Sequence, residues 1–279
     1  ALKMTNKLSN HHRADSLALL SHIFSCPVED FYRDADKVLT KKQNKDLDGL
    51  ILRLKKLEPI AYILAYQDFW ESSFHVNKHV LIPRPETEIL LEKVLDLIGD
   101  LSFVEKRSLR VLDIACGSGC IGLSLVKASK NLSCDLWDIC EQAVALSQKN
   151  LKALGLDPSR AKVLLKDALQ PKNWENLDKY DILVANPPYI AKEEIKHVSQ
   201  EVLDFEPHKA LFAGDGGLEF YFALARLAPL ALKEGGSLFV EVGFQQANKV
   251  SEIFLENGFK NIEISKDYNG HNRVVKGSL

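Results

Sequence analysis

The sequence predicts an α/β fold in which a mostly parallel sheet of seven strands follows a small N-terminal helical region. Three observations lead to this fold class. From about residue 85 onward, strand-like apolar runs alternate with helical patterns, whereas before residue 66 the apolar residues recur at helical spacing only. A glycine-rich turn follows the first apolar run of the alternating part. Alternation of this kind predicts helices on both faces of the sheet and ligands at the carboxyl ends of its strands.

Residues 1–66 are expected to form an N-terminal helical domain. Their apolar residues recur at helical spacing in two groups, Leu17, Leu20, Ile23 and Phe24 and then Leu47, Leu50, Ile51, Leu54 and Leu57. The region carries 11 Lys and Arg against 8 Asp and Glu and is therefore mildly basic. Residues 67–84 contain two short alternating runs, "DFWESSFHV" and "HVLIP", which predict a β-hairpin linker between the domains.

Residues 85–279 are expected to form the α/β domain. Runs rich in β-branched and apolar residues predict strands at 109–114, 132–137, 162–165, 181–185, 237–242, 261–265 and 273–276. Amphipathic patterns between them predict helices at 86–98, 121–129, 141–154, 218–232 and 246–257.

Composition excludes several classes of protein. The chain has 279 residues and a net charge of −2, which argues against a protein held on nucleic acid by bulk electrostatics. No apolar run approaches the roughly 20 residues that span a bilayer, and no signal-peptide pattern is present, so we expect a cytoplasmic protein without a membrane contact. The five cysteines are an odd number without a Cys-x-x-Cys pair, and neither a disulfide framework nor a metal site is predicted.

The segment "VLDIACGSGCIG", residues 111–122, predicts a cofactor site. Gly117, Gly119 and Gly122 have the Gly-x-Gly-x-x-Gly spacing at a strand-to-helix turn, where the missing side chains let the main chain approach a ligand. On its own, this pattern fits both a nicotinamide dehydrogenase and a methyltransferase that binds S-adenosylmethionine.

Two carboxylates lie at or near the ends of two consecutive predicted strands. Asp113 lies four residues before Gly117, where a carboxylate suits the ammonium of a methionyl group better than a diphosphate. Asp138 ends the next predicted strand, 19 residues after Gly119, where it can accept hydrogen bonds from both ribose hydroxyls. Asp113 therefore favours the methyltransferase, while Asp138 fits either cofactor.

The segment "ANPPYIA", residues 185–191, predicts a receptor for a planar –NH2 group. Each proline fixes its own φ, and Pro188 also keeps Pro187 out of the helical region, so the main-chain carbonyls stay available. The side-chain carbonyl of Asn186 and the main-chain carbonyl of Pro187 can accept the two amide hydrogens, and Tyr189 supplies a flat wall. Such a grip positions a weakly nucleophilic nitrogen for methyl transfer without a strong general base.

Taken together, these blocks closely resemble the HemK/PrmC family of peptide chain release factor glutamine methyltransferases. The resemblance covers nearly the whole chain and rests on "LIPRPETEILLE" (81–92), "VLDIACGSGCIGLSL" (111–125), "YDILVANPPYIA" (180–191), "EPHKALFAGDGGLEFY" (206–221) and "GHNRVVKG" (270–277). It implies a Rossmann-like class I methyltransferase fold with S-adenosyl-L-methionine as cofactor. The implied substrate is the glutamine of the Gly-Gly-Gln loop in class I peptide chain release factors, and the implied partner is the release factor itself.

The resemblance also implies site residues, some of which depart from the family's pattern. The cofactor turn falls on Ala115, Cys116, Gly117, Ser118 and Gly119, the ribose acid on Asp138, the adenine-side contacts on Asp167 and Ala168, and the substrate clamp on Asn186, Pro187, Pro188 and Tyr189. Asn186 is expected to contact the cofactor as well. The block from Pro83 to Thr87 is expected to border the cofactor pocket. The family usually has Gly-Thr at Ala115-Cys116 and often an aromatic residue at Ala168.

Three other functions remain open from the residues. An adenine amino-methyltransferase acting on DNA or RNA would use the same Asn-Pro-Pro-Tyr grip on a flipped base. It would be expected to carry a basic nucleic-acid-binding region, whereas residues 67–279 carry 25 Lys and Arg against 30 Asp and Glu. A dehydrogenase would leave the proline turn unexplained. A binding module without catalysis would leave Asp113, Asp138 and Asn186 unexplained.

Overall fold

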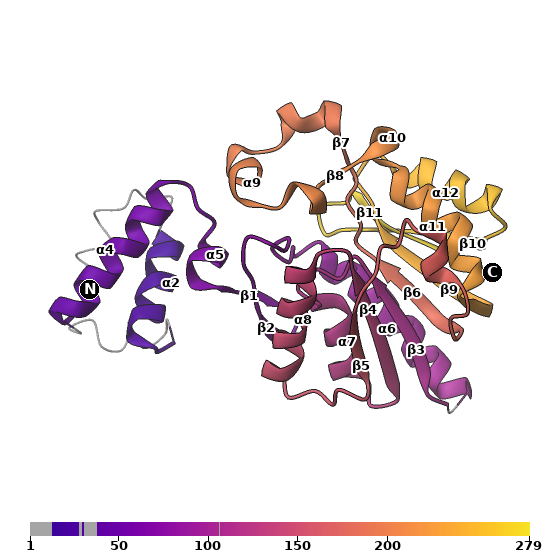
Figure 1. The fold of residues 1–279 in the computed structure, drawn as a ribbon, viewed down its shortest axis with the longest axis horizontal. Coiled ribbons are helices and arrows are strands. Elements are labelled where there is room, and N and C mark those ends of the chain that lie inside the picture. The colour runs from indigo at the N-terminus through magenta and orange to yellow at the C-terminus, as the bar shows by residue number, and fades with distance from the viewer. Residues whose placement is uncertain (1–12, 28–29, 31–37, 106) are drawn as a thin grey trace. The chain divides into compact units, whose positions relative to one another are not determined.

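The computed structural model describes residues 13–27, 30, 38–105 and 107–279 (Figure 1). Parts of the predicted N-terminal domain, residues 1–12, 28–29 and 31–37, lie outside the described residues. By its internal contacts the chain divides into two units, one up to Tyr66 and the other Gln67–Leu279. No helix among the described residues is long and apolar enough to cross a membrane.

The first unit is helical where it is described. Its helices are α2 (Arg13–Phe24), α4 (Lys41–Lys55) and α5 (Ile60–Leu64). A capping box in which Thr40 and Gln43 bond each other's main chain begins α4. Leu20, Leu47 and Leu54 of the two predicted apolar groups meet in one core, together with Leu19, which was not predicted. Leu17 and Leu57 are not part of this core; α4 ends before Leu57, which is 53% exposed.

The predicted hairpin is present but shorter than the linker segment suggested. Strands β1 (Tyr66–Phe69) and β2 (Ser72–His75) pair with each other, and both lie around the first of the two alternating runs. Trp70, whose φ is +53°, and Glu71 make the turn between them. The second run, residues 79–83, forms no strand, since Pro83 and Pro85 lack the N–H groups that a strand pair requires.

The second unit is built on a seven-stranded sheet with the order β10-β11-β9-β6-β3-β4-β5. Strand β11 is antiparallel to β9 and β10, and the other pairs are parallel. The strands are β3 (Leu109–Ile114), β4 (Leu132–Asp138), β5 (Ala161–Leu165), β6 (Tyr180–Ala185), β9 (Leu232–Glu241), β10 (Lys260–Lys266) and β11 (Asn272–Ser278). All seven predicted strands are thus confirmed, although β9 begins five residues before the predicted start at Ser237.

Helices cover both faces of this sheet (Figure 1). One apolar cluster joins the sheet to α6 (Thr87–Glu105), α7 (Cys120–Ala128) and α8 (Glu141–Ala153), and the other joins it to α11 (Glu219–Leu227) and α12 (Ala247–Glu256). The predicted helix at 218–232 ends early as an α-helix, because Pro229 lies in the 3₁₀ turn η5 (Ala228–Leu230) that follows α11. The chain runs from β3 to β5 on one side of β3 and continues with β6 on the other, so a topological switch point lies between β3 and β6.

Several short elements were not predicted. Between β6 and α11 lie β7 (Ile190–Ala191), η3 (Lys192–His197), α9 (Gln200–Phe205), η4 (His208–Ala210), β8 (Phe212–Ala213) and α10 (Gly214–Gly217), and η2 (Pro171–Trp174) follows β5. Strands β7 and β8 pair in parallel as a separate small sheet beyond the end of β6 (Figure 1). Elements of two to six residues are too short to show a hydrophobic period, which is why sequence patterns did not reveal them.

Candidate active site

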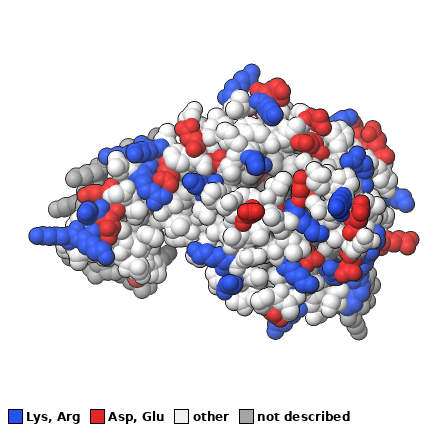
Figure 2. Space-filling model, viewed as in Figure 1, with Lys and Arg blue, Asp and Glu red and all other residues white. Residues whose placement is uncertain are grey.

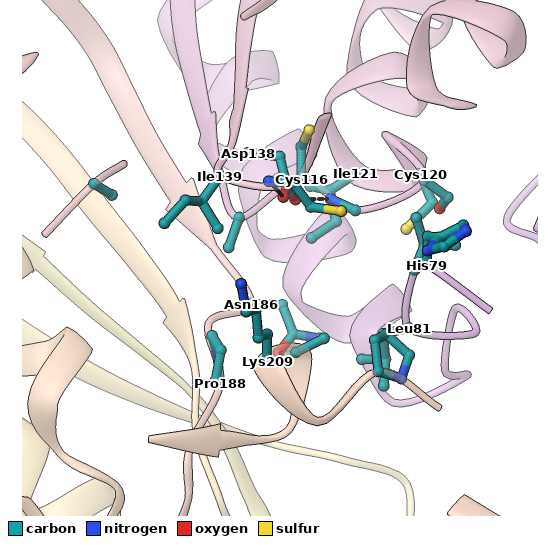
Figure 3. Close-up of a pocket in the computed structure, with 18 of the residues that line it drawn as sticks. His79, Leu81, Cys116, Cys120, Ile121, Asp138, Ile139, Asn186, Pro188 and Lys209 are labelled. Atoms are coloured by element: carbon teal, nitrogen blue, oxygen red, sulfur yellow. Dashed lines mark hydrogen bonds between the residues drawn. The ribbon is translucent and has the colours of Figure 1, made fainter. Parts of the chain in front are cut away.

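A cavity of about 380 Å³ lies at the carboxyl ends of β3, β4, β5 and β6 (Figure 3). Nine of the predicted site residues line it: Ala115, Cys116, Gly117, Ser118, Asp138, Asp167, Ala168, Asn186 and Pro188. Pro83, Arg84 and Thr87 line it too, so the block before α6 borders the cavity as expected. Asp113, Gly119, Pro187 and Tyr189 are near in sequence but are not part of the lining.

The glycine-rich turn connects β3 to α7 through several residues of positive φ. Ala115, Gly117 and Gly119 have φ values of +57°, +55° and +79°. The Cys116 N–H donates to the Trp137 carbonyl at 2.9 Å, which ties the turn to the end of β4. A Cβ atom on Gly119 would collide with the Ser147 hydroxyl, whereas one on Gly117 would meet nothing within 4 Å. A side chain at position 119 would therefore clash, whereas the space beside the Gly117 Cα atom is open.

Asp138 holds this turn against the next strand. Its Oδ2 accepts a hydrogen bond from the Gly117 N–H and its Oδ1 accepts one from the Cys140 N–H, both at 2.8 Å. Burial raises the pKa of Asp138, and the hydrogen bonds from Cys140 and Gly117 oppose the rise. Figure 3 shows Asp138 beside Cys116 at the end of the cavity formed by the turn. The ribose contact predicted for Asp138 stays a prediction.

Asp113 lies differently from what its predicted role required. It is fully buried, does not line the cavity, and accepts a hydrogen bond from the Gly122 N–H at 2.8 Å. Side chains alternate along a strand, and Asp113 shares the face of Val111, which is covered by α6 and α7. Burial raises its pKa to about 7. This geometry gives Asp113 a main-chain partner in the interior and no direct access to the cavity.

The end of β6 presents the Asn-Pro-Pro-Tyr segment. Asn186 and Pro188 line the cavity, and Figure 3 places both on one of its walls. The Asn186 Nδ2 donates to the Thr87 Oγ1 at 3.0 Å. The Tyr189 hydroxyl donates to the Glu241 Oε1 at 3.4 Å, and the Tyr189 carbonyl accepts from the Gln246 Nε2 at 2.8 Å. Burial raises the pKa of Tyr189. The loop is thus held by both side-chain and main-chain contacts.

Two buried residues at this site were given no individual role from the sequence, although Thr87 belongs to the block that was expected to border the pocket. Thr87 begins α6 and donates its hydroxyl to the Glu241 Oε2 at 2.6 Å. Glu241 ends β9 and is 1% exposed, and burial raises its pKa to about 7. Strands β6 and β9 are paired so that Ala185 lies beside Val240, which brings Asn186 and Glu241 to the same level. Sequence patterns could not reveal this neighbour, because it depends on the strand order.

The opposite part of the cavity is formed by residues after β5. Asp167 accepts a hydrogen bond from the Leu169 N–H at 2.9 Å, which shapes a tight turn. Ala168 is buried, and its carbonyl accepts from the Trp174 Nε1 at 2.9 Å. Ile139 lines this cavity and is 58% exposed. At the position where the family often has an aromatic residue, this chain has the small side chain of Ala168, and Ile139, which follows β4, is an accessible apolar residue on the same cavity.

Comparisons with known proteins identify the family. Residues 87–220 match the methyltransferase small domain, and residues 3–64 match the PrmC N-terminal domain. The release factor glutamine methyltransferase of Clostridium acetobutylicum is 38% identical over 98% of this chain and 93% of its own length. A bifunctional methyltransferase of Rickettsia typhi is 35% identical over 97% of this chain, but the chain spans only 54% of that protein.

A solved structure supports the fold. The methyltransferase of Pyrococcus furiosus is 13% identical and superimposes with a TM-score of 0.50 over 83% of this chain and 96% of its own. At this identity the likeness concerns the fold alone. The sequence matches, by contrast, cover both units and include a relative of nearly the same extent. The chain belongs to the release factor glutamine methyltransferase family, and it is an S-adenosylmethionine-dependent methyltransferase.

Proposed function

We propose that this protein methylates the side-chain amide nitrogen of the glutamine in the Gly-Gly-Gln motif of class I peptide chain release factors, and so modulates translation termination. The observation that carries the proposal is the orientation of Asn186 on the cavity wall. Its amide nitrogen is occupied by Thr87, so its carbonyl oxygen is the group left to accept an N–H from a substrate. A release factor as substrate would place the enzyme in the cytoplasm.

The residues around the cavity suit S-adenosylmethionine. Small-molecule sites commonly have volumes of roughly 300–1,000 Å³, and this cavity of about 380 Å³ falls within that range. The open main chain at Gly117 would face the methionine part, Asp138 would accept the ribose hydroxyls, and Asp167 and Ala168 would border the adenine. When bound, this cofactor supplies an electrophilic methyl group. Asp113, being buried against Gly122, would support the turn from beneath.

The clamp residues would position the attacking nitrogen. The Asn186 carbonyl and the Pro187 main-chain carbonyl would accept the two N–H bonds of the glutamine amide, and the Tyr189 ring would bound the space for the amide plane. Fixing both N–H bonds favours a pyramidal nitrogen whose lone pair is directed at the methyl carbon. The nitrogen sheds a proton once it has become cationic, so no strong general base is needed among the cavity residues.

The test is transfer of labelled methyl from S-adenosylmethionine to purified release factor, followed by mass mapping of the modified residue. Label on the Gly-Gly-Gln glutamine is expected, and its absence from a factor with that glutamine replaced is the control. Label that appears on nucleic acid alone would reject the proposal in favour of an adenine amino-methyltransferase.

A pair of variants separates binding from chemistry within the same assay. Asn186→Ala should leave the affinity for S-adenosylmethionine close to normal while transfer falls by about two orders of magnitude or more, because an acceptor that orients the nitrogen is lost. Asp138→Ala should instead weaken cofactor binding, measured by calorimetry, since its carboxylate faces the cavity and also holds Gly117. Equal affinity in the two variants would contradict these assignments.

A further inference from the structure

We infer that Thr87 and Glu241 are positioning residues that fix which way the Asn186 carboxamide faces. This inference rests on the proposed function, because it concerns the residue that would accept the substrate amide. It assigns a role to two buried residues, Thr87 on the cavity lining and Glu241 outside it, that would act through Asn186.

The three side chains form one continuous chain of hydrogen bonds. The Asn186 Nδ2 donates to the Thr87 Oγ1 at 3.0 Å, and the Thr87 hydroxyl donates to the Glu241 Oε2 at 2.6 Å. Thr87 and Glu241 are 2% and 1% exposed, so water has little access to either bond. The residues come from the end of β6, the start of α6 and the end of β9, three elements that share one apolar core.

While Glu241 is ionised, the chemistry of these groups sets the direction of every bond. An ionised carboxylate can only accept, so the Thr87 hydroxyl must donate its single proton to Glu241. The Thr87 oxygen then has only lone pairs to offer Asn186, and the Asn186 group that faces it must be the NH2. The Asn186 carbonyl oxygen is thereby left for a substrate N–H. Without the carboxylate, the hydroxyl could turn its proton to Asn186 and favour the reversed carboxamide.

The surroundings of Glu241 determine when it is ionised. The charged and titratable groups around it include Arg273 from β11, Glu86 before α6, Cys120 of α7, and the hydroxyls of Tyr189 and Tyr221. Burial raises the pKa of Glu241 to about 7, while the bond from Thr87 and the charge of Arg273 oppose the rise. The second carboxylate oxygen accepts from Tyr189, so the same glutamate is linked directly to Tyr189 and, through Thr87, to Asn186.

The experiment compares Thr87→Val with Thr87→Ser in the intact protein. Valine keeps the shape of threonine but removes both bonds, whereas serine keeps the hydroxyl. We expect kcat for methyl transfer to the release factor to fall about tenfold or more in Thr87→Val, with the Kd for S-adenosylmethionine changed by less than about threefold. Thr87→Ser should recover most of the lost kcat. A Thr87→Val enzyme with normal kcat, or a Thr87→Ser enzyme equally slow, overturns the inference.

Tyr221→Phe is the matched control for local disruption. The Tyr221 hydroxyl donates to the main-chain carbonyl of Glu241 at 2.9 Å and does not touch the carboxylate. Its loss should lower stability and leave kcat unchanged. If Tyr221→Phe slows transfer as much as Thr87→Val, the effect reflects damage around Glu241 and the inference is rejected.

A readout without substrate separates this inference from the proposed function. The side-chain 15N–1H2 signals of Asn186, identified by their loss in Asn186→Asp, should shift and exchange faster with water in Thr87→Val than in Thr87→Ser. Unchanged signals in Thr87→Val overturn the inference. If the wild-type protein transfers no methyl to the release factor, the proposed function fails, and the NMR comparison still decides whether Thr87 and Glu241 hold Asn186.

Discussion

Ala115 is the residue at which this chain departs most visibly from the glycine-rich turn of its family. Its φ of +57° lies in the left-handed region, which disfavours residues that have a Cβ atom. The family's usual glycine would adopt this φ without strain. No contact in the structure explains why alanine stands at this position. The chain therefore carries a strained residue on the wall of its own cavity.

Ala115→Gly should therefore stabilise the protein. Relief of the left-handed strain is worth roughly 1–2 kcal/mol, and the greater freedom of glycine in the unfolded chain offsets about 0.4–1 kcal/mol of it. We expect a net gain of roughly 0.5–1 kcal/mol in urea unfolding. The matched control is Ala128→Gly at the end of α7, where helical geometry makes glycine destabilising by about the same amount. A loss of stability in both variants would contradict the argument.

At the scale of elements, a helix or strand could be predicted from the sequence when its apolar pattern was long, and a site residue when its contacts were local in the sequence. Strands β3, β4 and β6 and helices α7 and α8 carry sustained apolar patterns and were predicted almost to the residue. The second half of the linker was predicted wrongly as a strand, because the alternation of "HVLIP" looked strand-like although prolines prevent pairing. The glycine turn and the Asn-Pro-Pro-Tyr loop were visible because each is local. Glu241 was not, since only the pairing of β9 with β6 brings it beside Asn186.

The short helix α10 supports the Asn-Pro-Pro-Tyr loop through a close approach that was also invisible in the sequence. Gly217 has a φ of +83°, and a Cβ atom there would collide with the Tyr189 carbonyl and lie 2.8 Å from the Gln246 Nε2. Gly216 has a similar φ of +62°, but a Cβ atom on it would meet nothing within 4 Å. A residue with a Cβ atom would be strained at either position, and only at position 217 would it also collide with its neighbours.

Gly217→Ala should damage the loop, and Gly216→Ala is its control. Both variants carry a left-handed penalty of about 1–2 kcal/mol, and Gly217→Ala adds an overpacking cost of about 1–3 kcal/mol. We expect methyl transfer to fall more in Gly217→Ala than in Gly216→Ala, because only the former displaces Tyr189. Equal stability and equal rates in the two variants, measured by unfolding and by labelled transfer, would show that the close approach is not important.

At the scale of the whole molecule, two buried carboxyl groups make stability depend on pH. Burial raises the pKa of both Asp113 and Glu241 to about 7. In the unfolded chain both would ionise near pH 4, so between about pH 4 and 7 the folded state binds more protons than the unfolded state. The free energy of unfolding should therefore fall as pH rises through this window and level off above it. Each pKa unit of elevation corresponds to about 1.4 kcal/mol.

Denaturation at several pH values from about 5 to 9 tests this dependence. All three tryptophans lie in the second unit, at positions 70, 137 and 174, so their fluorescence follows the unit that holds both carboxyl groups. Glu241→Gln and Asp113→Asn should each flatten the decline and be more stable than the wild type above pH 7. Asp181 and Asp267, whose pKa values are lowered, act in the opposite direction and only in acid. An unfolding free energy that rises from pH 5 to 8 would contradict the prediction.

We propose that residues 1–66 dock the release factor. Figure 2 shows Lys and Arg side chains interspersed with Asp and Glu on the visible face of this unit. Lys41, Lys42 and Lys45 are exposed in the first turns of α4. A glutamine on a mobile loop offers few contacts to the cavity, and a second contact elsewhere would raise the effective concentration of that loop.

Reversing the charge of Lys41, Lys42 and Lys45 to glutamate tests this role without endangering the fold. Acidic residues near a helix N-terminus are favoured by the helix dipole, so α4 should be as stable as before or more stable. Methylation of the full release factor should drop by about tenfold or more, because complementary charges guide association. Methylation of a short Gly-Gly-Gln peptide and binding of S-adenosylmethionine should stay normal, since neither needs the docking surface. If the relative rates of methylation of the peptide and the full factor stayed unchanged, Lys41, Lys42 and Lys45 would have no part in docking. Any docking by the first unit would then have to use other residues of its surface.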